Sequence, residues 1–469
     1  MKKRRFLWVL GFLLVAGVAV AGALFLANRR DLTTGSEEAY EAYKEGILNE
    51  NRFYFKEARA DFAKALEKDP SFAMAMLGLA RRSSDREQAA TLVKRAARQE
   101  SRLTERERLY VELSLADVEK RRDEMIKVAR ELHAKYPDDS RSASILAGDE
   151  LGRGNPEQAI KIWEDLLAVD PNNAEAYNQI GYYYGYRGDY DKAMDNLKRY
   201  QFISPDNANP FDSLGENQAN AGRYNEAIEN LNRALAIKPD FGPAYWHLGV
   251  VEEGLGEYDK AFQSYMKAAE LDDTDMRRQY LVWAMRAAVL GEDVPAARSA
   301  LAQLRKLPVD PKSDHAAIDP VAFGIFEDLI DGRAPEAERR LRELKPVIEG
   351  VFDEARKAGK MVPGRKPHFP DWNVLMARAL VMQGKTDEAE KLYEENANPP
   401  NPFYDYNDRR FIMEARAKVA EYLARKGDLD KAEKLIAENR KWNPSWAPCR
   451  PSETAVAELR RAKVLAASK

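Results

Sequence analysis

One cysteine and four histidines leave this 469-residue chain few groups for disulfide or metal chemistry. The single thiol of Cys449 cannot form an intrachain disulfide, and it excludes a zinc or iron–sulfur site built from several cysteines. The histidines are too scattered to predict a metal cluster: His133, His247, His315 and His368. We therefore expect no bound metal and no cofactor, and we interpret the histidines as surface or packing residues.

The chain also lacks a strong net charge. Its 74 Lys and Arg residues are matched by 77 Asp and Glu residues, which gives a net charge of −3. This balance disfavours a basic nucleic-acid binder, so we expect no nucleic-acid partner. A 45% hydrophobic and 10% aromatic composition is sufficient for a sizeable core, which excludes a wholly disordered chain.

The common catalytic motifs are missing from the sequence as well. HExxH, GxSxG and a GxGxxG that follows a strand are all absent. Gly384-Lys385-Thr386 resembles the end of a phosphate-binding loop, but Ala379 stands where its first glycine belongs. Acidic pairs such as Glu252-Glu253 fit solvated helix surfaces better than acid–base catalysis. The protein is therefore predicted not to be an enzyme, with no catalytic residue.

A long apolar segment near the N-terminus is the strongest local signal. Residues 6–27 carry no charge, and a helix of that length spans ~33 Å, enough to cross a bilayer. Four basic residues precede the segment, which favours a cytoplasmic N-terminus and places residues 31–469 on the exported side. This pattern predicts a signal-anchor. A cleaved signal peptide is the alternative, because Ala19-Val20-Ala21 fits a cleavage site and would give a secreted form.

The rest of the chain contains small residues that recur with a period of 34. Four alanines define the period: Ala159, Ala193, Ala227 and Ala261. A large apolar residue follows each alanine by four positions: Trp163, Leu197, Leu231 and Tyr265. Glycines precede the last three alanines by twelve positions: Gly181, Gly215 and Gly249. We expect pairs of antiparallel helices that cross closely where these glycines and alanines lie.

Two further residue types mark where each helix of a pair ends. Gly188, Gly222 and Gly256 lie in the middle of their units, where a residue with positive φ can close the first helix. Pro171, Pro205 and Pro239 follow the alanines by twelve positions and end the second helix.

These units resemble the tetratricopeptide repeat (TPR) family, which consists of 34-residue helix–turn–helix units. The resemblance implies an all-α superhelix, or α-solenoid, and it weakens outside residues 140–275. The predicted organisation is a cytoplasmic tip and anchor at 1–30, degenerate units at 31–139, well-formed units at 140–275, degenerate helix pairs at 276–347, and C-terminal units with a capping helix at 348–469. We expect exposed loops at 349–371, where a charged helix end comes first, and at 394–410.

A narrower resemblance connects the chain to the TPR segments of bacterial membrane Ser/Thr kinases and regulators. Leu103-Thr104-Glu105-Arg106-Glu107-Arg108-Leu109 carries it, followed by a unit that ends in Tyr136-Pro137-Asp138-Asp139. In those proteins a kinase or DNA-binding domain precedes the repeats. Only five residues precede the apolar segment here, so we expect that activity to be absent. The resemblance implies a bacterial envelope protein anchored in the inner membrane, with its repeats in the periplasm.

By resemblance, the first helix of each unit lines a concave groove. The residues predicted to contact a partner are Asn178, Tyr182 and Tyr186 in 174–207, Asp212, Glu216 and Asn220 in 208–241, and Trp246 and Val250 in 242–275. Glu253 is placed on the same face. Amides suit the backbone of an extended peptide, aromatic rings cover its side chains, and acids favour basic residues. The alternative is that the tyrosines are packing and surface residues.

The sequence therefore predicts a non-catalytic scaffold or adaptor of the cell envelope that binds a protein or peptide segment in its TPR groove. The alternative function is a regulatory sensor subunit, coupled through its membrane anchor to a separate kinase or transporter.

Overall fold

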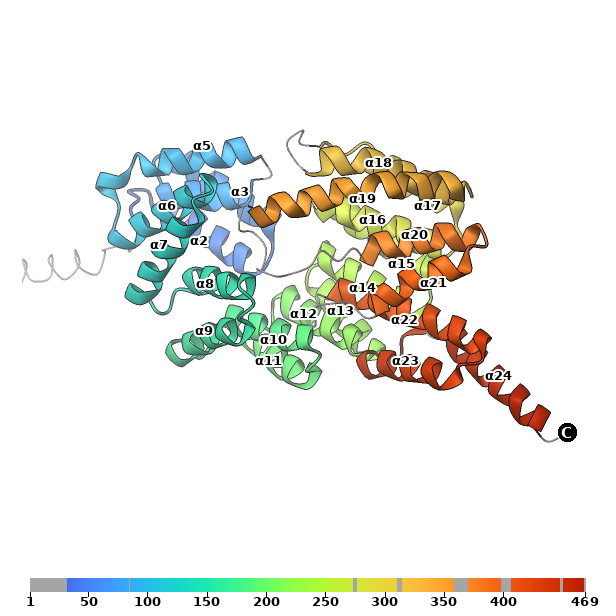
Figure 1. Ribbon diagram of the computed structural model, residues 1–469. Coiled ribbons are helices and arrows are strands. Elements are labelled where there is room, and N and C mark those ends of the chain that lie inside the picture. The colour runs from blue at the N-terminus through green and yellow to red at the C-terminus, as the bar shows by residue number, and fades with distance from the viewer. Residues whose placement is uncertain are drawn as a thin grey trace, which may run out of the picture. The chain divides into compact units, whose positions relative to one another are not determined.

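The computed structural model describes residues 32–83, 85–272, 276–309, 314–357, 370–397, 406–447 and 450–467. These residues form successive α-helices joined by short turns, which confirms the predicted all-α solenoid (Figure 1). Across these ranges, none of the helices combines the length and the apolar character needed to span a bilayer. The predicted anchor at residues 6–27 lies outside the described residues.

The helices belong to two compact units, Met1–Lys135 and Tyr136–Lys469. The described helices of the first unit are α2 (Glu37–Asn51), α3 (Phe55–Lys68), α4 (Ala73–Arg81), α5 (Arg86–Ala97), η1 (Glu100–Arg102), α6 (Glu105–Val118) and α7 (Arg122–Lys135). Phe62 is fully buried in this unit, and the ring of Tyr43 packs 5.7 Å from it and 5.0 Å from the ring of Phe72. This boundary lies four residues before the one expected at 139.

The second unit contains the remaining helices. They are α8 (Ser140–Gly152), α9 (Pro156–Val169), α10 (Ala174–Arg187), α11 (Tyr190–Ile203), α12 (Ala208–Asn220), α13 (Tyr224–Ile237), α14 (Gly242–Leu255), α15 (Tyr258–Leu271), α16 (Met276–Leu290), α17 (Val294–Leu304), α18 (Asp314–Ile330), α19 (Ala334–Lys357), α20 (Pro370–Met382), α21 (Thr386–Ala397), α22 (Tyr406–Lys426), α23 (Leu429–Trp442) and α24 (Arg450–Ala467).

The small residues of the 34-residue period lie where two helices of a pair cross. A Cβ atom on Gly181 of α10 would lie 2.6 Å from Cγ of Leu197, and one on Gly249 of α14 would lie 2.6 Å from Cε1 of Tyr265. Ala261, from the facing helix, has no exposed surface. Contacts this short leave no room for a larger side chain, so the predicted close crossings are confirmed.

The ends of the helices also follow the sequence. α10 is closed by Gly188, which has a φ of 77°, and α14 by Gly256, which has a φ of 80°. Left-handed backbone of this kind is costly for residues that carry a Cβ atom. The second helices α11 and α13 end shortly before Pro205 and Pro239, because proline cannot continue a helix.

The motif at residues 103–109 begins α6. The hydroxyl of Thr104 accepts a hydrogen bond from the Glu107 N–H (3.3 Å), and Glu107 Oε2 accepts one from the Thr104 N–H (2.8 Å), which is a capping box. The carboxylate of Glu107 is fully buried and also accepts the Thr33 N–H (2.7 Å). The chain that enters the first unit is therefore fixed to the start of α6.

The charged helix end expected at the start of residues 349–371 is confirmed. Residues 349–357 continue α19 to Lys357, although Pro346 lies inside this helix. Lys357 Nζ pairs with Glu354 Oε1 one turn earlier (2.9 Å), which supports the last turn of this helix. The loop predicted at 394–410 is wrong at both ends, because residues 394–397 end α21 and residues 406–410 begin α22. Residues 370–371 likewise begin α20, whereas residues 358–369 and 398–405 lie outside the described residues.

Candidate binding face on the first helices

The eight residues predicted to contact a partner all lie on the first helices of three consecutive pairs. Within each helix they are spaced by four positions, so they share one side of it. α10 carries Asn178, Tyr182 and Tyr186, α12 carries Asp212, Glu216 and Asn220, and α14 carries Trp246 and Val250. We call the surface that these eight residues form the first-helix face.

Side chains of the three helices meet in a polar cluster on this face. The Tyr182 hydroxyl donates a hydrogen bond to Glu216 Oε2 (2.6 Å) and lies 3.3 Å from Ser213 Oγ. His247 of α14 contacts both acids of α12, through Nδ1 to Asp212 Oδ1 (2.7 Å) and through Nε2 to Glu216 Oε2 (3.4 Å). The structure therefore brings together three of the predicted residues, with His247 between the two carboxylates.

Burial and charge set the protonation of this cluster. Burial alone would lower the pKa of the His247 imidazole, but the Asp212 and Glu216 carboxylates outweigh it and raise that pKa to about 9. Burial raises the pKa of the Glu216 carboxyl, although His247 and the Tyr182 hydrogen bond oppose the rise. Burial and the two acids raise the pKa of the Tyr182 phenol well above its usual value. At neutral pH His247 is thus charged, and its Nδ1–H donates to Asp212.

Four buried polar atoms on or beside this face have no hydrogen-bond partner among the described residues. They are Asn178 Oδ1, Asn220 Oδ1, Trp246 Nε1 and His247 Nε2, the last of which makes only the ion contact to Glu216. Such atoms are uncommon inside proteins, because each one loses its bond to water without replacement. Two of the four are carbonyl acceptors and Trp246 supplies a donor, which is the mixture that a peptide backbone can satisfy.

The remaining predicted residues have different surroundings. Tyr186 is exposed and its ring lies 6.0 Å from that of Tyr182, at the edge of the cluster. Val250 is 4% exposed and packs in the hydrophobic core with α15 and α16, so its side chain contributes to stability there. The Trp246 ring lies 4.7 Å from His247 and 5.8 Å from Tyr280 of α16.

Sequence reasoning missed the part that His247 plays in the cluster. The signal was present in the period: Tyr182 and Glu216 hold the same position in successive units, and His247 follows Asp212 by 35 residues. Equivalent positions of neighbouring first helices lie side by side, so an acid and a histidine at adjacent positions of successive units meet.

The acidic pair Glu252-Glu253 is not the solvated surface that the sequence suggested. Glu253 is 4% exposed, accepts a hydrogen bond from the Tyr265 hydroxyl (3.1 Å) and pairs with Arg286. Glu252 accepts one from Ser264 Oγ (2.7 Å). Both carboxylates thus join helices, and no group of acids, histidines or cysteines in the described residues could hold a metal ion.

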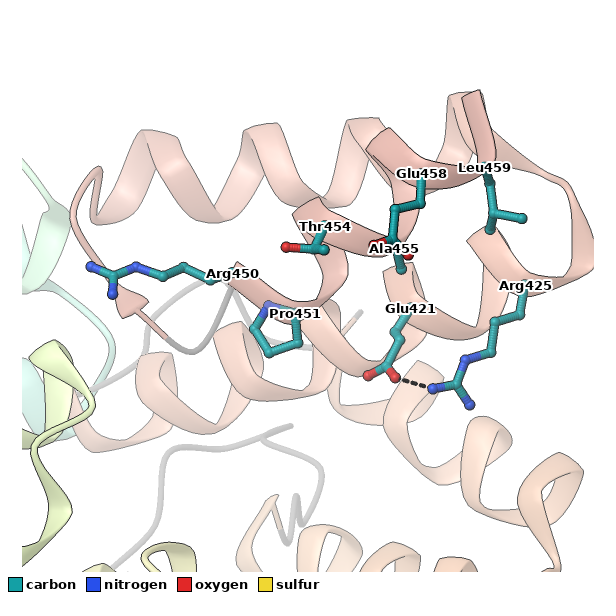
Figure 2. Close-up of a pocket in the computed structure, with 8 residues that line it drawn as sticks. All are labelled: Glu421, Arg425, Arg450, Pro451, Thr454, Ala455, Glu458 and Leu459. Atoms are coloured by element: carbon teal, nitrogen blue, oxygen red, sulfur yellow. Dashed lines mark hydrogen bonds and ion pairs between the residues drawn. The ribbon is translucent and has the colours of Figure 1, made fainter. Parts of the chain in front are cut away.

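A shallow pocket lies between α22 and α24 (Figure 2). It is lined by Glu421, Arg425, Arg450, Pro451, Thr454, Ala455, Glu458 and Leu459. Glu421 and Arg425 form an ion pair one helical turn apart on its wall. Its lining mixes both charges with short apolar side chains, which favours no particular ligand.

Comparison with known proteins agrees with the repeat geometry. Tetratricopeptide repeat models match residues 146–208 and 242–275, and a TPR repeat model matches residues 220–253. No curated protein matches the sequence.

Two solved structures are among those that match this chain. The crystal structure of MamA is 25% identical over 34% of this chain and 93% of its own, with a TM-score of 0.29. The crystal structure of the APC/C hetero-tetramer Cut9-Hcn1 is 15% identical over 96% of this chain and 82% of its own, with a TM-score of 0.49. The family matches and the close helix crossings of α10–α15 together identify tetratricopeptide repeats within residues 146–275 of this chain.

Proposed function

We propose that this protein is a non-catalytic adaptor that binds an extended segment of a partner protein on its first-helix face. TPR repeats generally mediate protein–protein interaction. The observation that carries the proposal is the set of four buried polar atoms without hydrogen-bond partners on or beside α10, α12 and α14.

An extended peptide offers one N–H and one C=O per residue, and both need partners when the peptide is buried. In the proposed complex, Asn178 Oδ1 and Asn220 Oδ1, which lack partners among the described residues, would accept hydrogen bonds from peptide N–H groups, and Trp246 Nε1 would donate to a peptide carbonyl oxygen. The Tyr186 and Trp246 rings add apolar contact area at the same place, which is typical of residues that dominate binding energy.

The charges of the face favour a basic partner segment. Two buried carboxylates, those of Asp212 and Glu216, contact a single imidazolium, that of His247, so acidic groups outnumber basic ones in the cluster. An acidic side chain that approached Glu216 would meet like charge in a poorly solvated place, whereas Lys or Arg would not.

The experiment is quantitative recovery of cross-linked partners from intact cells with the full-length protein. Trp246→Ala and Tyr182→Ala are expected to lose at least about 90% of the partner signal, since central aromatic residues carry much of the energy of an interface. Phe202→Ala is the matched control, because this aromatic ring lies on the second helix α11 and is 82% exposed. Unchanged recovery with both face variants would refute the proposed site.

We further propose that residues 6–27 anchor the protein in the inner membrane with its repeats on the exported side. The uncharged length of this segment and the four basic residues before it support this proposal. Alkaline extraction of membranes should leave the full chain in the pellet, and a variant without residues 1–30 should not sediment. An N-terminus beginning at Gly22 in the purified protein would instead establish cleavage and secretion.

A further inference from the structure

The last helix pair of the second unit contacts the α12–α13 turn, more than two hundred residues earlier in the chain. Asn443, which follows α23, donates hydrogen bonds from Nδ2 to the Ala219 carbonyl oxygen (3.3 Å) and to the Tyr224 hydroxyl (3.1 Å). The Asn443 side chain is 4% exposed, so this contact is part of a packed interface.

Glycine at the end of α12 makes room for the Asn443 loop. A Cβ atom on Gly222 would lie 2.5 Å from Asn443 Oδ1 and 3.1 Å from Pro444 Cδ. One repeat later, a Cβ atom on Gly256 would lie 3.7 Å from the Cβ atom of Ala447. The loop Asn443–Ala447 thus follows the row of turns that end the first helices α12 and α14.

An ion bridge joins α22 to α14 through α16. Arg286 of α16 pairs with Glu253 of α14 and, through Nη2, with Glu414 Oε2 of α22 (2.9 Å). Glu253 is one of the residues that the repeat register places on the concave side. Through Arg286, helix α22 is therefore linked to Glu253 at the C-terminal end of the first helix α14.

The burial of α12 agrees with a cover on that side. Twelve of its thirteen residues are buried, including the polar residues Asn209, Asp212, Glu216 and Asn220. In α10, by contrast, six of fourteen residues are buried. A helix covered only by the neighbours of its own repeat array would leave a polar stripe exposed.

We propose that α22, α23 and the loop Asn443–Ala447 form a built-in lid on the first-helix face. A partner protein binds this face after it displaces the lid. The contacts of the lid include two neutral hydrogen bonds and an ion bridge, and bonds of these kinds contribute little enough individually for a local segment to open without unfolding the repeats. The role of the lid in controlling partner binding rests on the proposed function, whereas the packing of the lid against α12 does not.

Hydrogen exchange of the full-length protein tests whether the lid covers α12 and α14. Asn443→Ala removes both hydrogen bonds, so amides of α12 and α14 should exchange about tenfold faster, while α18 and α19 keep their protection. Ser204→Ala is the matched control, since Ser204 holds the same position after α11. Unchanged exchange in α12, or equal acceleration of all helices of the second unit, would overturn the lid.

A pair of glycine variants gives an independent test. Gly222→Ala forces a Cβ atom against Asn443, whereas Gly384→Ala has the same kind of backbone (φ 76° against 75°) and open space around its Cβ atom. Both variants strain a turn, but only Gly222→Ala should release α12 to exchange. Equal exchange of α12 in the two variants would contradict the proposal.

Partner recovery separates the lid from the proposed function. If the lid covers the first-helix face and this face binds the partner, Asn443→Ala should recover several-fold more cross-linked partner than the unaltered protein. The added change Trp246→Ala should abolish the gain. Loss of partner in Trp246→Ala together with unchanged α12 exchange in Asn443→Ala refutes the lid alone. Faster α12 exchange together with full partner recovery in Trp246→Ala and Tyr182→Ala refutes the proposed function alone.

Discussion

At the scale of single residues, the helix crossings tolerate almost no added volume. Gly249→Ala would place a Cβ atom 2.6 Å from the buried ring of Tyr265, and overpacking of this kind should lower the free energy of unfolding by roughly 1–3 kcal/mol. Gly148→Ala is the matched control, because this glycine of α8 has open space around it, and alanine should stabilise the helix by about 0.5–1 kcal/mol. Urea denaturation of both variants measures the difference, and a shift of the same sign in both would contradict the close crossing.

His247 makes the stability of the second unit dependent on pH. Its pKa is raised from about 6.5 to about 9 in the folded state, so the stabilisation is fully present below pH 6.5 and is lost as the pH rises through 9. The expected loss is up to about 3 kcal/mol, because each unit of pKa difference corresponds to ~1.4 kcal/mol. Denaturation at a series of pH values should show this decline in the unaltered protein.

His247→Gln should remove that decline, and His133→Gln in the first unit should keep it. The groups that face the imidazole are Asp212 and Glu216, with the Tyr182 hydroxyl bonded to Glu216. A decline of the same size in His247→Gln would show that another group titrates.

At the scale of helices and turns, the sequence predicted those features that depend on a local rule. The Gly and Ala crossings, the left-handed turn at Gly188 and the helix ends before Pro205 all follow from residue size and backbone geometry. The 34-residue register also predicted that the eight residues of the first-helix face lie on first helices, and the structure places them there. Their contact with a partner stays a prediction.

Other features depend on contacts that no local pattern records. The Asp212–His247 contact joins helices of successive pairs, and no sequence pattern shows which of the four histidines meets an acid. The contact of Asn443 with Ala219 depends on the path of the whole second unit.

The start of α6 provides a prediction at this scale. Thr104→Ala removes the cap and should lower the free energy of unfolding of the first unit by about 1 kcal/mol. Glu107→Ala should cost more, since this carboxylate accepts the N–H groups of both Thr104 and Thr33, and it should speed amide exchange at residue 33. Thr91→Ala is the control, because this exposed threonine bonds only within α5, and its replacement should be nearly neutral. Equal effects of all three changes would exclude the cap as the cause.

At the scale of the whole molecule, the two compact units should fold separately. Each has its own buried core, with Phe62 and Phe72 in the first and Tyr265 and Leu281 in the second. The division at Lys135 and Tyr136 falls between α7 and α8, before Asp139, whose carboxylate caps α8 by accepting the Ser142 N–H (2.8 Å). A chain that begins at Tyr136 therefore keeps the complete start of its first helix.

We expect the chain Tyr136–Lys469 to show the helical circular dichroism and the cooperative thermal transition of a folded repeat array. A chain that begins at Ser140 lacks Asp139 and should be less stable by about 1 kcal/mol, because the first N–H groups of α8 lose their acceptor. Limited proteolysis of the full protein should cut first near the junction at residues 135–139 and leave both fragments intact. Because the two cores are separate, we expect the Tyr136–Lys469 chain to keep its cooperative transition. Loss of that transition would show that the folding of the second unit depends on the first.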